Sequence, residues 1–114
     1  MISFACKTID VRDIVLCSFD LTKTEYGILA YLLQQPEPLP ITTIAQANRL
    51  ERSTVQKSIV ALLARGLVER RQINHPGGGY RYIYAVIERD DIKQRIRTIV
   101  DGWHKKVLEA VQGW

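Results

Sequence analysis

The sequence is poor in the residues that most catalytic and metal sites need. Among its 114 residues it has two histidines and two cysteines, and neither His75 nor His104 has a cysteine or carboxylate pair nearby at a motif spacing. Metal ligation needs three or four convergent ligands, whereas Cys6, Cys17, His75 and His104 are scattered along the chain. We therefore expect no metal site, no catalytic residues and no cofactor, and a protein that is not an enzyme.

Signals for disulfides and for membrane insertion are also missing. Cys6 and Cys17 are eleven residues apart and form no CxxC pair, which predicts two reduced thiols packed as small apolar groups. No apolar run approaches the roughly 18 to 20 residues of a membrane span. No basic segment or long apolar stretch precedes Cys6, as it would in a lipoprotein signal. We expect no membrane partner and a cytoplasmic protein.

Acidic residues are scarce in one segment, and this scarcity sets the charge of the chain. In residues 51–81 only Glu51 and Glu69 oppose six basic side chains, which are Arg52, Lys57, Arg65, Arg70, Arg71 and Arg81. The other 83 residues hold ten basic and ten acidic side chains, so the net charge of +4 falls within this segment. A clustered positive patch can steer and hold a phosphate backbone, which points to a nucleic-acid partner.

The chain does contain a succession of short amphipathic elements. Apolar residues at three- and four-residue steps predict helices over about residues 9–18, 23–35, 41–47, 52–65 and 90–112. Thr22 and Glu25 predict a capping box at the second helix, and Thr42 is a candidate cap for the third. Asn48 suits a left-handed turn position, and Gly66 is expected to end the fourth helix.

A β-hairpin is predicted after the fourth helix. Residues 67–72 and 80–87 are expected to be strands, and residues 74–79 form a glycine-rich tip. The three glycines lack the Gly-x-x-x-x-Gly-Lys-Ser/Thr spacing of a phosphate-binding loop, and they follow a strand, so a plain hairpin turn is favoured. Tyr80, Tyr82 and Tyr84 alternate along one face, where packing within the hairpin is favoured over stacking on bases.

The third and fourth helices are joined by a tight turn, an arrangement that lets the second of two helices enter a major groove. At about 100° per residue, Val55, Ile59, Leu62 and Leu63 fall on one side of the fourth helix and are expected to face the core. The opposite side is small and polar near its start and carries no carboxylate. Such a face suits base reading in a groove roughly 12 Å wide; a solvated outer face is the alternative.

The stretches Ile41–Gln46, Arg52–Ile59 and Leu62–Val68 resemble MarR-type and TrmB-like winged-helix regulators, and Leu21–Tyr26 looks like the start of the first winged-helix helix in the TrmB-like group. The resemblance implies a homodimer whose third helices enter successive major grooves of double-stranded DNA while the wings touch flanking backbone. The expected fold is mainly α with a small β-hairpin wing (α+β), a winged helix-turn-helix with N- and C-terminal dimerisation helices. We assign residues 1–19 to an N-terminal helical arm, 20–88 to the DNA-binding domain and 89–114 to a C-terminal dimerisation helix.

Two sets of residues are candidates for these contacts. The predicted DNA-binding residues are Thr42, Arg52, Ser53, Thr54, Gln56, Lys57, Arg70, Arg71, His75 and Arg81. The predicted dimer interface is an approximate heptad stripe on the last helix, made of Ile92, Ile96, Ile99, Trp103 and Val107.

Two other functions remain open at this stage. One is a winged helix used for protein–protein contact within the transcription machinery. The other is a thiol-sensing DNA-binding regulator, since Cys6 and Cys17 lie in an N-terminal segment that is expected near the dimer interface. The sequence points to no particular small-molecule effector.

Overall fold

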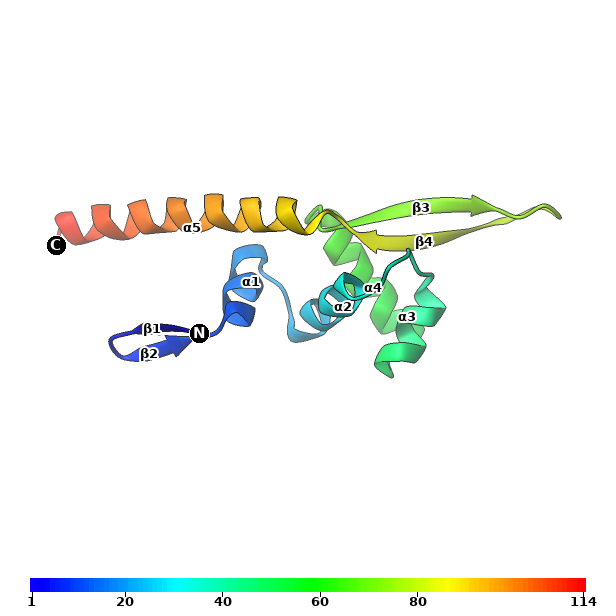
Figure 1. Ribbon diagram of the computed structural model, residues 1–114, viewed down its shortest axis with the longest axis horizontal. Helices are drawn as coiled ribbons and strands as arrows, with labels where there is room; N and C mark the ends of the chain where they lie inside the picture. The colour runs from blue at the N-terminus through cyan, green and yellow to red at the C-terminus, as the bar shows by residue number, and fades with distance from the viewer. The chain divides into compact units, whose positions relative to one another are not determined.

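A computed structural model describes residues 1–114, which form two compact units: Thr22–Ile87, and Met1–Leu21 together with Glu88–Trp114. The first unit contains the helices α2 (Lys23–Leu33), α3 (Ile41–Asn48) and α4 (Arg52–Ala64) and the strands β3 (Val68–Asn74) and β4 (Tyr80–Val86). The second contains the strands β1 (Ile2–Phe4) and β2 (Lys7–Ile9) and the helices α1 (Val11–Phe19) and α5 (Arg89–Gln112) (Figure 1).

The three helices of Thr22–Ile87 pack around one apolar core. Helix α2 begins at the predicted capping box: the Glu25 amide donates to the Thr22 hydroxyl over 3.1 Å, and the Thr22 amide donates to the Glu25 carboxylate over 3.0 Å. The core side chains come from all three helices and from the root of the β3–β4 hairpin: Ile28, Leu29, Leu32, Ile44, Val55, Ile59, Leu62, Leu67 and Tyr84. Each such large aliphatic group stabilises the fold by about 1.5–3 kcal/mol.

The turn between α3 and α4 differs from the sequence prediction at two residues. Thr42 does not cap α3, because Pro40 is the N-cap residue and Thr42 already lies within the first turn. Asn48 is not the left-handed residue either. It stays helical and its side-chain amide donates to the Ile44 carbonyl over 2.8 Å, so the left-handed position falls on Arg49, at φ +54°.

The β3–β4 hairpin is the wing of the fold, and α2, α3 and α4 lie along it near its root (Figure 1). Tyr84 and Leu39 exchange two backbone hydrogen bonds of 2.8 and 2.9 Å, which attach β4 to the loop after α2. At the other end, the tip reaches beyond α3 and α4 (Figure 1). There Gly78 and Gly79 have φ values of +99° and +80°, which other residues adopt only with strain. The expected α+β winged helix-turn-helix is thus confirmed.

In the other unit, α1 packs against α5. The Arg95 guanidinium lies 4.9 Å from the centre of the Phe19 ring, and Phe19 and Ile92 are both buried. Helix α5 runs unbroken through Gly102, with Asp90 and Asp91 in its first turn as predicted. None of the helices is both long and apolar enough to cross a membrane.

The β1–β2 hairpin was not predicted from the sequence, which indicated no regular structure before about residue 9. Its two antiparallel strands are three residues each, joined by the two-residue turn Ala5–Cys6. The register pairs Ile2 with Ile9, Ser3 with Thr8 and Phe4 with Lys7. The N-terminal segment therefore holds a hairpin followed by a helix.

Candidate nucleic-acid interface

Helix α4 presents a polar outer face, and its orientation is fixed by the core. Val55, Ile59 and Leu62 are fully buried, whereas Leu63 is only partly buried. On the opposite side most of the candidate residues are exposed, and Thr54 is half-buried; the exposed ones are Arg52, Ser53, Gln56 and Lys57. No carboxylate occurs between residues 52 and 68, so nothing on this face repels a phosphate backbone.

The start of α4 leaves its first amide groups open. Its N-cap residue, Glu51, makes no side-chain capping hydrogen bond, so the amides of the first turn are available to water or to an anion. One turn later the Ser58 hydroxyl donates to the Thr54 carbonyl over 3.0 Å, which satisfies the only buried polar side chain of the core. The buried side chains of Val55 and Ile59 fix the orientation of the first two turns, whose outer side chains face solvent.

Two exposed residues flank α4 on the α3 side. Thr42 lies in the first turn of α3 and is exposed. Arg49 is exposed at the joint between α3 and α4. It was not among the predicted DNA-binding residues, because the basic segment was taken to begin at residue 51. The sequence could have indicated Arg49, because the two predicted helices are close in sequence and any cation between them lies beside the start of α4.

The wing distributes its three arginines over two faces. Residues opposite each other in an antiparallel pair share a face, and the register places Arg70 opposite Tyr84 and Gln72 opposite Tyr82. Arg71 faces Ile83 and Arg81 faces Ile73, on the other side of the hairpin. Arg70 therefore belongs to the tyrosine face, and Arg71 and Arg81 belong to the isoleucine face.

The tyrosine face is internally organised. The Arg70 guanidinium lies 4.2 Å from the centre of the Tyr82 ring, and the rings of Tyr80 and Tyr82 meet edge to face with 5.4 Å between their centres. Tyr84 is buried at the root, where burial raises the pKa of its hydroxyl and the nearby Arg70 charge opposes that rise. These contacts bear out packing within the hairpin and place the Arg70 cation over the Tyr82 ring.

The hairpin tip is exposed and closed by its own backbone. The His75 amide donates to the Gly79 carbonyl and the Gly78 amide donates to the His75 carbonyl, each over 3.0 Å. His75 itself is exposed, as are all three wing arginines. The tip therefore carries a polar, exposed ring on a short turn that two left-handed glycines make possible.

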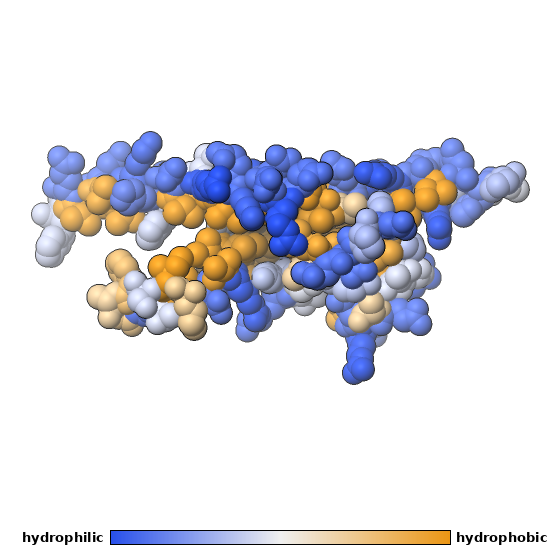
Figure 2. Space-filling model, viewed as in Figure 1, coloured by the Kyte–Doolittle hydropathy of each residue, from blue (hydrophilic) through white to orange (hydrophobic).

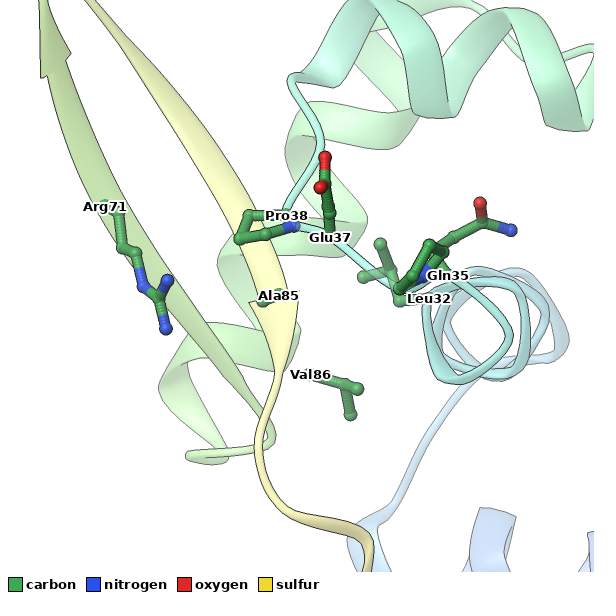
Figure 3. A pocket seen from close by; sticks show the side chains of 8 residues that line it. Leu32, Gln35, Glu37, Pro38, Arg71, Ala85 and Val86 are labelled. Atoms are coloured by element: carbon green, nitrogen blue, oxygen red, sulfur yellow. The ribbon is translucent and has the colours of Figure 1, made fainter.

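A shallow pocket of about 220 Å³ lies between the end of α2, the proline-rich loop and the wing. Figure 3 shows Arg71 on β3 and Ala85 on β4 along one side, with Leu32 and the loop residues Glu37 and Pro38 on the other. The volume is below the roughly 300–1,000 Å³ of drug-sized ligand pockets. Arg71 therefore contributes both to the wall of this pocket and to the charge of the isoleucine face.

Charge divides sharply between the two units. Thr22–Ile87 holds eight basic and four acidic side chains, a net of +4, whereas the other unit holds eight of each. The whole positive excess therefore lies on the unit that carries α4 and the wing.

The predicted dimer stripe on α5 is exposed along most of its length. Ile92 is only 6% exposed and Ile96 is half-buried within the protomer, whereas Ile99, Trp103 and Val107 are exposed. Figure 2 shows apolar side chains gathered along one side of α5 and polar ones along the other. Beyond its second turn, the helix thus has an uncovered apolar side.

The two cysteines are free, but they are not packed as the sequence analysis expected. Cys6 lies in the turn between β1 and β2 and Cys17 lies on α1, and both are exposed. Both were predicted to pack among apolar groups. Instead, Cys6 lies in a hairpin turn that was not predicted, and Cys17 lies on the side of α1 that faces solvent. No group of three or more His, Cys, Asp or Glu side chains is placed to hold a metal ion.

Comparisons with known proteins identify a family and two similar archaeal proteins. The model of the MarR family matches residues 19–77. A possible transcriptional regulator from Methanosarcina mazei Go1 is 32% identical, with a TM-score of 0.89 over 100% of this chain and 96% of that one. An uncharacterised protein of Methanocaldococcus jannaschii is 31% identical over 89% of this chain and 82% of its own length.

A more distant structure shares the fold. A mutant of MepR from S. aureus, bound to an oligodeoxyribonucleotide, has a TM-score of 0.57 at 22% identity and covers 87% of this chain and 72% of that one.

Proposed function

Since this chain belongs to the MarR family, a family of winged-helix transcription regulators, we propose that it binds double-stranded DNA in a sequence-specific manner as a homodimer. The observation that carries the proposal is the restriction of the positive excess to Thr22–Ile87, together with the carboxylate-free outer face of α4. The MepR structure, which is bound to an oligodeoxyribonucleotide, supports DNA as the partner.

In this proposal the outer face of α4 enters the major groove. Ser53, Thr54 and Gln56 carry the hydroxyl and amide groups that pair with base edges. Arg52 and Lys57 neutralise phosphates or contact guanine, and Thr42 contacts the backbone from the start of α3. We add Arg49 to this set because it is an exposed cation at the joint between the two helices.

The wing is proposed to contact the DNA flanking the reading helix. Arg70, Arg71 and Arg81 are exposed cations, and His75 is exposed at the tip. Cations on a narrow projecting hairpin suit phosphates or the minor groove. Because the arginines lie on two faces, they are expected to contact different phosphates.

The homodimer is proposed to form along α5. A helix side with exposed Ile99, Trp103 and Val107 is unfavourable in water, and a second copy offers the same surface. Two copies also supply two reading helices, which suits a palindromic site. We place the protein in the cytoplasm because its proposed partner is chromosomal DNA, and we assign it no catalytic role because the matched family consists of transcription regulators.

Selection of bound sequences from random duplex DNA at a stated salt concentration tests the proposal. We expect enrichment of a palindromic sequence, and at least a hundredfold preference for it over scrambled duplex in a titration. Binding with no enrichment, or no binding to duplex DNA at low salt, would contradict it. The alternative use of the fold for protein–protein contact predicts that second result.

Thiol sensing is a second candidate, which the exposure of both thiols favours. It predicts that a mild thiol oxidant weakens DNA binding by the native chain and not by the double variant Cys6→Ser, Cys17→Ser. Equal affinities of the oxidised and reduced native chain would dismiss it.

A further inference from the structure

The β1–β2 hairpin has one apolar and one polar face. The register puts the apolar Ile2, Phe4 and Ile9 on one face together with Lys7, which is paired with Phe4, and it puts Ser3 and Thr8 on the other. Ile2 is 51% exposed and Phe4 is 70% exposed. The apolar face of the hairpin is therefore largely uncovered in the single chain.

Such a hairpin needs a surface to pack on. A two-stranded hairpin by itself is marginally stable in water, and packing of its apolar face against another element makes it stable. This one has only three residues in each strand. The presence of Ile2 and Phe4 on one face points to a specific apolar surface that covers it.

The same unit contains a second uncovered apolar surface, on α5, on which the apolar face of the hairpin could pack. Helix α5 has 24 residues and is about 36 Å long, whereas α1 has nine residues and spans about 14 Å. The contact of Arg95 with Phe19 places α1 against the first turns of α5. Farther along α5 the apolar side is exposed, and Trp103 is 64% exposed. The exposed apolar residues there are Ile99, Val100, Trp103, Val107, Leu108 and Val111.

We propose that the apolar face of β1–β2 packs on the second half of α5 of a second copy of this chain, with Phe4 of one protomer against the stripe around Trp103 of the other. A two-fold dimer makes this contact twice, because each copy supplies both surfaces. The inference rests on the homodimer proposed above and assigns it an exchanged N-terminal arm. Within one protomer both Phe4 and Trp103 remain exposed, so the chain does not cover these surfaces for itself.

The area of the two surfaces fits this occupant. With about 150–250 Å² for an aromatic side chain, the exposed apolar residues of the hairpin and of α5 amount to roughly 800 Å². Each partner of a standard interface buries about 800 Å², and in a two-fold dimer each copy contributes both surfaces to that area. Phe4 and Trp103 are also of the kind that anchors interfaces, since large aromatic side chains are enriched among the residues that dominate binding.

The first test compares dimer dissociation constants by sedimentation. We expect Phe4→Ser to raise the dissociation constant at least tenfold, and Thr8→Ala, on the polar face, to leave it within about twofold. If the native chain is a dimer and Phe4→Ser dissociates no more readily, the arm is not part of the interface, although the homodimer stands. If the native chain is a monomer at micromolar concentration, the homodimer itself fails and the arm contact with it.

The second test does not depend on how Phe4→Ser folds. One chain keeps Cys6 and carries Cys17→Ser, and a second, longer-tagged chain carries Cys6→Ser, Cys17→Ser and Ala110→Cys, because Ala110 lies on the apolar side of α5. Oxidation of the mixture is expected to give a disulfide-linked heterodimer on a non-reducing gel. A matched chain with Lys105→Cys, on the opposite side of α5, is expected to give at least fivefold less. Equal yields from both would overturn the contact.

Discussion

Single side chains on α4 and on the wing are expected to contribute to DNA binding in different ways. Gln56 and Ser53 lie at the start of the exposed face of α4, the part of a reading helix that meets base edges. Arg71 lies on the wing, where contacts to the backbone carry no direct sequence information. Reading and positioning are therefore separable at the level of single residues.

We predict that Gln56→Ala weakens binding to the selected site by about 1–3 kcal/mol and barely affects random duplex DNA. Arg71→Ala is expected to weaken both more evenly and to flatten the salt slope by about one unit. Titrations of both variants on both DNAs at matched salt measure this. If Gln56→Ala weakened binding to both DNAs equally, α4 would not be the element that recognises the base sequence.

The stacking of Arg70 on Tyr82 leads to a second prediction. A cation held over an aromatic ring gains about 0.5–1 kcal/mol at an exposed site, so we expect Tyr82→Leu to weaken DNA binding two- to fivefold. Tyr82→Phe keeps the ring and is expected to bind like the native chain. Fluorescence anisotropy with labelled operator DNA separates the two variants, and a loss shared by Tyr82→Phe would point to the hydroxyl in place of the ring.

At this scale, the helical period sufficed to predict which side of α4 is buried, and Val55, Ile59 and Leu62 lie there. Strand alternation puts Arg70 and Arg71 on opposite faces, but which of the two shares a face with the tyrosines, and which with Arg81, was out of reach. It depends on the pairing of Asn74 with Tyr80, and a glycine-rich tip permits several loop lengths, each with a different register. When the register moves by one residue, Arg70 shares a face with Arg81, and Arg71 shares a face with the tyrosines.

Among the elements, α2 offers the most direct test of local stability. Its capping box satisfies two backbone amides that would otherwise lack partners within the helix. We predict that Thr22→Ala lowers the free energy of unfolding by about 1 kcal/mol, measured by urea titration with circular dichroism. Thr24→Ala is the control. Thr24 is the second residue of α2 and is also exposed, so this change is expected to have little effect.

Helices were easier to predict than the short strands for a physical reason. From α2 onwards each predicted helix or strand is present within about two residues of its expected ends, because its apolar period extends over several turns or strand positions. Strands β1 and β2 have three residues each, too few for alternation to stand out. Their turn, Ala5–Cys6, also lacks the glycine or asparagine that usually marks a two-residue hairpin.

For the whole molecule, the charge of Thr22–Ile87 predicts a strong dependence of binding on salt. If each protomer neutralises three or four phosphates, a dimer neutralises about six to eight, and the slope of log affinity against log salt is roughly −5 to −7. Titrations over a range of salt concentrations give this slope. A slope near zero would contradict an electrostatic interface.

The exposed stripe of α5 leads to a prediction about assembly. The double variant Ile99→Ser, Trp103→Ser is expected to be monomeric at micromolar concentration in sedimentation, and to bind palindromic DNA more weakly because two reading helices no longer act together. Asp101→Ser lies on the polar side of α5 and serves as the matched control. If the double variant remained a dimer, the dimer interface would have to lie on a surface other than this stripe of α5.

The pairing of α1 with α5 belongs to the part of the structure that sequence patterns do not encode. Residues 1–21 and 88–114 form one unit, although more than sixty residues separate them in the sequence. Amphipathic periods show that a helix has an apolar side, but the partner of that side is decided by which other surfaces remain uncovered after the core of Thr22–Ile87 has formed.

At position 49, the left-handed conformation of Arg49 makes thermal stability and affinity for DNA favour different residues. A residue other than glycine in this conformation costs about 1–2 kcal/mol, so Arg49→Gly is expected to stabilise the fold. The same change removes one of the eight cations of Thr22–Ile87, beside the start of α4. Variants selected only for survival at high temperature would therefore be enriched in glycine at position 49 and would bind DNA less tightly, whereas selection for occupancy of an operator would keep the strained arginine.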